Sequence, residues 1–263
     1  MNQLTVPGQK LKLTPFGVFK LESGLMRISD PCYNKDDECV GLVEAKKGFW
    51  AAYVANEDQC RPSHLLVFHQ SYNPEDFTSA TLTLLDFEAG VDSGQCGFYD
   101  DEFYNCFEDQ AYREVCDITL GGDLYYQNQM IQTKRRLGGD KKAEAYYQGL
   151  LDHEDCDPLN RKVIEEWLSQ SQASNELTAE DLQIESDYLE HPRAGIVDCL
   201  GHSGYGVVSS TAHGDGGYQV FAIHDPAGEV VGLMLDYIYS FDPEAEDDEE
   251  DSWEEEDVPV DGR

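Results

Sequence analysis

The sequence predicts an α+β protein with an antiparallel, sandwich-like β-rich body, a mostly helical insertion and an acidic C-terminal tail of the disordered type. Three observations lead to this prediction. Apolar stretches with strand-like alternation occupy residues 1–98 and 196–240. Residues 99–195 are instead acidic, rich in Tyr and Gln, and contain helical patterns. Residues 241–263 hold 13 acidic residues and one basic residue, which is typical of a solvated chain.

The strands of the first half follow from alternation and turn residues. Residues 16–30 alternate loosely and stop at Asp30-Pro31, because Asp-Pro favours a turn. Two apolar stretches, residues 40–45 and 49–54, flank Lys46-Lys47-Gly48. A short loop that contains glycine is typical of a hairpin, so we expect these two stretches to pair. Further strands are predicted at residues 64–69, 79–92 and 205–210.

The clearest hairpin joins residues 218–223 to residues 229–239 through Asp225-Pro226-Ala227-Gly228. Pro at the second position and Gly at the fourth suit a type I turn. This hairpin is expected to end the β body.

The insertion contains three helical patterns. Residues 141–151 predict the first helix. The second is predicted to begin at Asp157, a favoured N-cap, with Pro158 in the first turn. The third is predicted to begin at Thr178, whose spacing to Asp181 resembles a capping box, and to end before His191-Pro192.

The charge of the chain restricts its partners. The 53 Asp and Glu residues outnumber 18 Lys and Arg residues, which gives a formal net charge of −35. DNA, RNA and anionic lipids are bound through Lys and Arg, so we expect no direct nucleic acid and no membrane as a partner. The tail accounts for −12, which leaves −23 on the other 240 residues. Such a body attracts basic protein surfaces.

The average charge density is too low for a DNA mimic unless the carboxylates gather on one face. A globule of 29.6 kDa exposes roughly 11,600 Å², or about 330 Å² for each net charge. That density is about a third of the density of B-DNA. The carboxylates predicted to bind a partner are Asp100, Asp101, Glu102, Glu108, Asp109, Asp152, Glu154, Asp155, Asp157, Glu180, Asp181 and Glu185.

One basic cluster opposes this trend. It consists of Lys134, Arg135, Arg136, Lys141 and Lys142. The cluster is suited to phosphate, to the protein's own acidic surface or to a solvated loop. The last two interpretations are favoured over phosphate.

The chain is expected to be cytoplasmic with reduced cysteines. No stretch of about 18 apolar residues predicts a transmembrane helix, and residues 1–12 lack the apolar run of a signal peptide. The eight cysteines include no Cys-x-x-Cys pair, so neither disulfides nor structural zinc is expected. No cofactor is predicted.

Three polar clusters lie at strand ends or turns: Ser29-Asp30-Pro31, residues 92–97 (DSGQCG) and residues 209–218 (SSTAHGDGGY). Together with the hairpin 218–239, these DP, VDSGQ and GDGxY motifs resemble a family of uncharacterised bacterial and phage proteins, a domain-of-unknown-function group. The resemblance covers the β body and departs from the family pattern at Ala212-His213. It implies a β-rich fold and no established activity, and it implies host cytoplasm if the chain is phage-encoded.

The same clusters contain the candidate reactive groups. Asp30, Asp92 and Asp215 are hard oxygen ligands suited to Mg²⁺ or Ca²⁺, although Asp beside Gly or Pro more often stabilises turns. Cys96 is a candidate nucleophile with His213 or His202 as its base, but acidic surroundings raise the pKa of a thiol. The chain has no G-x-S-x-G, P-loop or H-E-x-x-H motif.

These observations favour a non-enzymatic acidic protein that binds a basic protein surface. One form of it is a phage or mobile-element inhibitor of a nucleic-acid-handling host defence enzyme. One alternative is a metal- or cysteine-dependent hydrolase with its site at Asp30, Asp92 and Asp215. Another is an immunity-type binding module. The sequence leaves the partner and the oligomeric state open.

Overall fold

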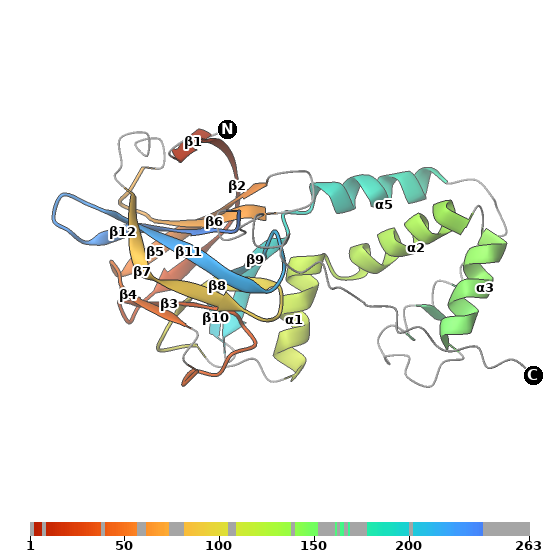
Figure 1. Ribbon diagram of the computed structural model, residues 1–263, viewed down its shortest axis with the longest axis horizontal. Helices are drawn as coiled ribbons and strands as arrows, with labels where there is room; N and C mark the ends of the chain where they lie inside the picture. The colour runs from red at the N-terminus through yellow and green to blue at the C-terminus, as the bar shows by residue number, and fades with distance from the viewer. Residues whose placement is uncertain are drawn as a thin grey trace, which may run out of the picture.

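The protein consists of a β-sandwich and a group of helices that lie to one side of it (Figure 1). The computed structural model describes residues 3–6, 9–37, 40–56, 62–73, 82–104, 109–137, 140–151, 161, 164–165, 168, 178–199 and 202–238. The strands are β1 (Gln3–Val6), β2 (Gln9–Leu21), β3 (Leu25–Ser29), β4 (Gly41–Glu44), β5 (Gly48–Asn56), β6 (Pro62–His69), β7 (Leu82–Val91), β8 (Gln95–Asp100), β9 (Ala194–Cys199), β10 (His202–Ser210), β11 (Gly216–His224) and β12 (Val230–Asp236). The helices are α1 (Asp109–Leu120), α2 (Asp123–Leu137), α3 (Asp140–Leu151) and α5 (Ala179–Glu190). The predicted tail, residues 241–263, lies outside the described residues.

Two antiparallel sheets form the sandwich. In the described residues, one sheet has the order β1-β2-β5-β6-β12-β11-β7 and the other has the order β4-β3-β8-β10-β9. Every neighbouring pair of strands is antiparallel. The predicted fold class, a β-rich sandwich-like body with helices, is therefore confirmed.

The main core lies between the sheets, and a second apolar layer covers the outer face of the seven-stranded sheet. Successive side chains of a strand point to opposite faces. In β6, Leu65 and Val67 therefore enter the main core, whereas Leu66 and Phe68 enter the outer layer. Both faces of β6 are buried, which explains the unbroken apolar stretch HLLVFH in the sequence.

One predicted hairpin is wrong. The two stretches around Lys46-Lys47-Gly48 belong to different sheets, since β4 pairs with β3 and β5 pairs with β2 and β6. Residues 45–47 therefore carry the chain from one sheet to the other. The indole N–H of Trp50 donates to the Lys46 carbonyl oxygen at 3.0 Å and fixes this crossing.

The predicted β11–β12 hairpin is confirmed. The Gly228 N–H donates to the Asp225 carbonyl oxygen at 2.9 Å, as in a type I turn. Gly228 has a φ of 85°, a left-handed conformation that glycine adopts without strain.

The helices occupy the connection between β8 and β9. Helix α1 packs on the outer face of the five-stranded sheet, where Val115 contacts the cluster of Tyr99, Val197 and Val208. Helices α2, α3 and α5, which we call the arm, extend away from the sandwich (Figure 1). No helix in the described part of the chain is long and apolar enough to cross a membrane.

The predicted helices fare differently. Residues 141–151 are confirmed as α3. Helix α5 is confirmed with its capping box, because Thr178 accepts from the Asp181 N–H and the Asp181 carboxylate accepts from the Thr178 N–H. The start of the second predicted helix at Asp157 and Pro158 lies outside the described residues. The described residues 161, 164–165 and 168 are helical.

Arg193 anchors the arm to the sandwich. Its buried guanidinium group donates to the carbonyl oxygens of Leu120 (2.7 Å) and Tyr188 (2.9 Å), the last turns of α1 and α5. It also stacks 3.6 Å from the centre of the Tyr188 ring. A cation at a helix C-terminus is favourable, and here one side chain serves two helices.

Candidate functional site

The three polar clusters of the sequence meet at one end of the sandwich. Asp30 follows β3, residues 92–94 connect β7 to β8, and residues 211–215 connect β10 to β11. The Thr211 N–H donates to the Gly94 carbonyl oxygen at 2.9 Å, which joins the second cluster to the third. Because both connections cross between the sheets, the clusters close this end of the sandwich.

Asp30 joins the first cluster to the second. Its Oδ1 accepts from the Cys32 N–H and from the Ser93 hydroxyl, both at 2.7 Å. Its Oδ2 accepts from the N–H groups of Asp92 (2.9 Å) and Ser93 (2.7 Å). Four donors occupy the lone-pair sites that a carboxylate offers. The buried Asp30 therefore stabilises two turns, which is the alternative that the sequence favoured over a metal site.

Asp30, Asp92 and Asp215 do not form a metal-ligand set. Among the described residues, no three His, Cys, Asp or Glu side chains lie close enough to hold a metal ion. The oxygens of Asp30 are occupied by the turn donors, whereas Asp92 and Asp215 are exposed. The loops converge, but their carboxylates do not form the site that a metal-dependent hydrolase requires.

The candidate nucleophile Cys96 is contradicted by its place in the core. Strand β8 directs the Cys96 side chain into the core between the sheets, where it is fully buried. Burial, together with the negative charge of Asp30, raises the pKa of Cys96. A buried neutral thiol is inert. The candidate base His213 is exposed, and the side chain of His202 lies outside the described residues.

The thiol of Cys32 also lacks the lowered pKa of a nucleophile. Burial and a hydrogen bond with Asp30 raise the pKa of Cys32 to about 12. Cys32, Cys96 and Cys116 are free thiols.

The first acidic block divides between the interior and the surface. Asp100 is fully buried and accepts from the N–H groups of Glu22 (2.5 Å), Ser23 (3.0 Å) and Glu102 (3.1 Å). Asp100 was predicted to bind a partner, and this is wrong, because its carboxylate holds the β2–β3 turn from inside. The side chain of Glu102 is exposed.

Asp101, in the same block, is half-buried and forms an ion pair with Arg27 on the outer face of the five-stranded sheet. The Nε of Arg27 lies 2.8 Å from the Asp101 carboxylate, and Lys35 lies 3.7 Å from it. Asp101 is therefore already neutralised, unlike its neighbour Glu102. Glu108 and the side chain of Asp109 lie outside the described residues, as does the whole second block of Asp152, Glu154, Asp155 and Asp157.

The third acidic block lies on α5 and partly pairs with the basic cluster. Helices α2 and α5 are antiparallel, and Lys134 lies 3.5 Å from Asp181 while Arg135 lies 2.5 Å from Glu185. The prediction that the basic cluster binds the protein's own acidic surface is confirmed for these two residues. The carboxylates of Asp181 and Glu185 therefore pair with basic residues inside the arm, whereas Glu180 is exposed.

The two remaining basic residues with described side chains lie in the last turn of α2 and the first turn of α3. The Arg136 guanidinium lies 5.8 Å from the centre of the Tyr146 ring. Lys142 is exposed on α3. The basic cluster is thus distributed along two helices, and its inner members hold the arm together.

Two features were missed in the sequence, one on α5 and one at Arg193, just after this helix. Leu182 and Leu189 are exposed to solvent. Their spacing of seven residues places them on one side of the helix, and this spacing is visible in the sequence. The anchoring role of Arg193 has no comparable local signal, because both of its acceptors are brought to it by the fold.

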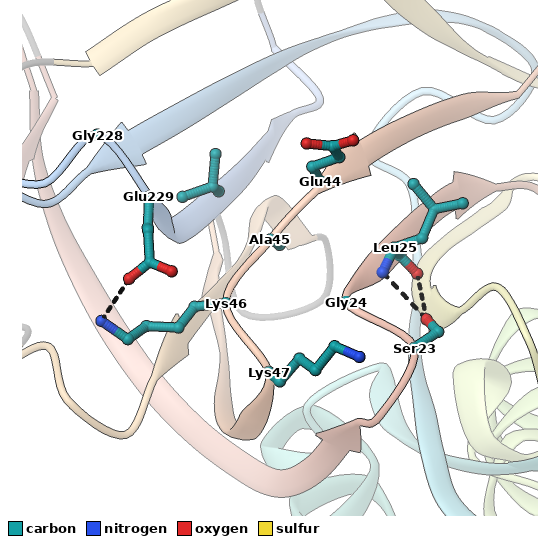
Figure 2. A pocket seen from close by; sticks show the side chains of 10 residues that line it. Ser23, Gly24, Leu25, Glu44, Ala45, Lys46, Lys47, Gly228 and Glu229 are labelled. Carbon is teal, nitrogen blue, oxygen red and sulfur yellow. Dashed lines mark hydrogen bonds and ion pairs between the residues drawn. The ribbon is translucent and has the colours of Figure 1, made fainter.

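A cavity of about 840 Å³ opens at the other end of the sandwich (Figure 2). It is lined by Ser23, Gly24, Leu25, Glu44, Ala45, Lys46, Lys47, Gly228, Glu229 and Val230. Lys46 reaches across to Glu229 at 2.9 Å, and to Asp225 at 3.1 Å, while Lys47 extends the other way (Figure 2). Hydrogen bonds with these two carboxylates raise the pKa of Lys46. The charges of this cavity mostly neutralise one another.

Comparisons with known proteins give no relative. No family model, no curated protein and no solved structure matches the chain. The resemblance to the bacterial and phage family stays a prediction.

Proposed function

We propose that this chain is a non-enzymatic acidic protein that binds a basic protein surface. The observation that carries the proposal is the outer side of α5. This helix contains five acidic residues and no basic residue. Asp181 and Glu185 pair within the arm, and Glu180, Asp187 and Glu190 are exposed. The formal net charge of −35 adds a long-range attraction for a basic partner to the local effect of these carboxylates.

A basic partner gains most from such a surface during encounter. Complementary charge accelerates association and selects among partners more than it increases final affinity. Enzymes that handle nucleic acids carry basic grooves, because Lys and Arg neutralise phosphates. We therefore infer that the partner is of this class, and inhibition of a host defence enzyme by a phage or mobile-element protein is one form of the function.

The test is the salt dependence of binding to a basic DNA-binding enzyme, followed by calorimetry at low and high salt. We expect the affinity to fall steeply as salt rises, because exposed charges are screened. Replacement of the three exposed α5 carboxylates in the variant E180Q/D187N/E190Q is expected to weaken binding about tenfold. The control variant E44Q/D92N/D215N changes the net charge equally on the sandwich, and its three positions are exposed.

Two outcomes would contradict the proposal. Affinity that is independent of salt excludes a charge-driven interface. Retention of full affinity in the α5 variant favours an immunity-type module whose charge serves only solubility. Removal of residues 241–263 without loss of affinity excludes only a model that relies on the tail. A pull-down from the native cell, washed at graded salt, identifies the partner.

A further inference from the structure

Helix α5 presents three different faces. Successive residues of an α-helix are rotated by about 100°. The face toward α2 contains Asp181, Ile184, Glu185 and Tyr188, all of which are buried or half-buried. One flank carries Leu182 and Leu189, and the other flank carries Glu180, Gln183 and Asp187. The helix therefore has an apolar stripe and an acidic stripe on opposite flanks of its outer side, and neither stripe packs against α2.

The apolar stripe is open to solvent. The residues are 53% exposed at Leu182 and 42% exposed at Leu189. Ala179 and Ser186, the other residues on this flank, are small and exposed. No bulky side chain of α5 thus separates the two leucines, which lie two helical turns or about 10.5 Å apart. Single exposed apolar residues scattered over a surface are normal, but two leucines aligned on one flank of a helix form an apolar stripe.

The arm does not need these leucines for its own packing. The contacts between α2 and α5 include the ion pairs Lys134–Asp181 and Arg135–Glu185, and the rings of Tyr125 and Tyr188 at 6.2 Å. The arm extends away from the sandwich, with α5 along one side of it (Figure 1). The outer side of α5 is therefore accessible to a partner over its 12 residues, about 18 Å.

We propose that the outer side of α5 is the docking surface for an amphipathic, basic α-helix of a partner protein. The partner helix lies along the outer side of α5, between the two stripes. It packs apolar side chains against Leu182 and Leu189 on one flank and extends long Lys or Arg side chains to Glu180 and Asp187 on the other. Helix recognition through apolar anchors at such spacing is a recurrent mode of binding. This inference rests on the proposed function and specifies the partner. A second copy of the chain does not complement the surface, because two acidic stripes repel each other.

The test uses two synthetic peptides of about 18 residues, or five helical turns, made of Lys and Leu. One peptide places its leucines on a single helical face, and the other has the same composition in scrambled order. Binding to the full chain is measured by calorimetry at low and high salt. Because both peptides carry the same charge, the difference between them isolates the apolar stripe.

The variant L182S/L189S is expected to weaken binding of the patterned peptide about tenfold, to the level of the scrambled peptide, as expected for two partly buried leucines. The control L84S changes a leucine of β7 that is 54% exposed. This variant is expected to bind the patterned peptide with the affinity of the native chain. Circular dichroism checks that the variants keep their helices.

Four results would overturn the inference. Equal affinity for the two peptides, or no effect of L182S/L189S, shows that the leucines do not contact the partner, while salt-dependent binding of both peptides leaves the proposed function intact. Binding of neither peptide at low salt contradicts the proposed function as well. A dimer of the native chain that dissociates in L182S/L189S, measured by sedimentation, identifies a second copy as the occupant.

Discussion

The sandwich and the arm use carboxylates in opposite ways. In the sandwich, Asp30 and Asp100 are buried and accept N–H donors from turns that connect the two sheets. They act at opposite ends of β3, since Asp30 follows this strand and Asp100 pairs with Met26 near its start. On the arm, Glu180, Asp187 and Glu190 face solvent. The same residue type thus stabilises the fold in one region and forms a surface in the other.

The difference shows that the number of carboxylates in a sequence does not give the surface charge. A buried carboxylate must be satisfied by donors, and a turn with several free N–H groups supplies them. A carboxylate in such a turn contributes to stability rather than to recognition. A carboxylate on the outer side of a helix has no such donors, so its charge is available to a partner.

The largest expected effect is on the sandwich. Replacement of Asp30 by Ala leaves three backbone N–H groups without their acceptor inside the protein. We expect the free energy of unfolding to fall by about 3–5 kcal/mol, because each unsatisfied buried donor is costly. Urea denaturation measures this loss.

The control is Asp92→Asn, which changes an exposed carboxylate in the turn that Asp30 holds. We expect a change within about 0.5 kcal/mol, as for ordinary surface substitutions. A similar loss in the free energy of unfolding of the two variants would show that burial does not distinguish carboxylates that stabilise the fold from carboxylates of the surface.

The second effect concerns the junction of the two regions. Replacement of Arg193 by Ala removes the donors to the carbonyl oxygens of Leu120 and Tyr188. We expect a loss of about 2 kcal/mol in the free energy of unfolding, from two charge-assisted hydrogen bonds at helix ends. Hydrogen exchange is expected to rise in α5 and α2 more than in the strands.

Arg136→Ala is the matched control, because Arg136 lies within the arm and contacts only the ring of Tyr146 among the partners shown. Its hydrogen exchange is expected to resemble that of the native chain at the junction. If Arg193→Ala accelerated exchange equally in the sandwich and the arm, the two regions would form one cooperative unit.

Local patterns were sufficient for much of the fold. The type I turn at Asp225 and the capping box at Thr178 are formed by residues within four positions of one another, so both could be predicted. The unbroken apolar stretch HLLVFH predicted a buried strand. In the structure both faces of this strand lie in apolar layers. These features depend on chemistry that neighbouring residues already contain.

The rest depended on contacts between distant residues. Residues 45–47 have the composition of a hairpin loop, but the pairing of β4 with β3 and of β5 with β2 and β6 makes them a crossing between sheets. Helix α1 contains Val, Ile and Thr, which favour helices weakly, and it is stabilised by packing on the sheet. No sequence pattern of local range shows either outcome.

The candidate site divides in the same way. That Asp30 stabilises turns was the favoured alternative, because Asp-Pro is a local signal. That Asp100 is buried was not visible, since its donors at Glu22 and Ser23 lie 78 and 77 residues away. The exposure of Leu182 also depends on which face of α5 meets α2, and this is decided by ion pairs between the two helices.

The smallest expected effect is a dependence of stability on pH, which both regions share. In the sandwich, the buried His69 accepts from the Ser71 N–H at Nδ1 (3.1 Å), and its Nε2 donates to the Lys47 carbonyl oxygen (3.0 Å), so the ring is neutral. Burial lowers the pKa of His69 below its ordinary value of 6.5. At the root of the arm, burial and the charge of Arg193 lower the pKa of His191.

Because these pKa values are lowered in the folded state, the unfolded chain binds protons first as the pH falls. The contribution of the neutral rings is therefore complete above about pH 6.5 and decreases as the pH falls toward the folded pKa values. We expect the urea midpoint to fall between pH 7.5 and pH 5, and the slope to flatten in His69→Gln. His224→Gln, at an exposed histidine of β11, is the control. A steeper slope in His69→Gln would show that the protonated ring is the stable form, and a flattening in His191→Gln alone would place the acid-sensitive step in the arm.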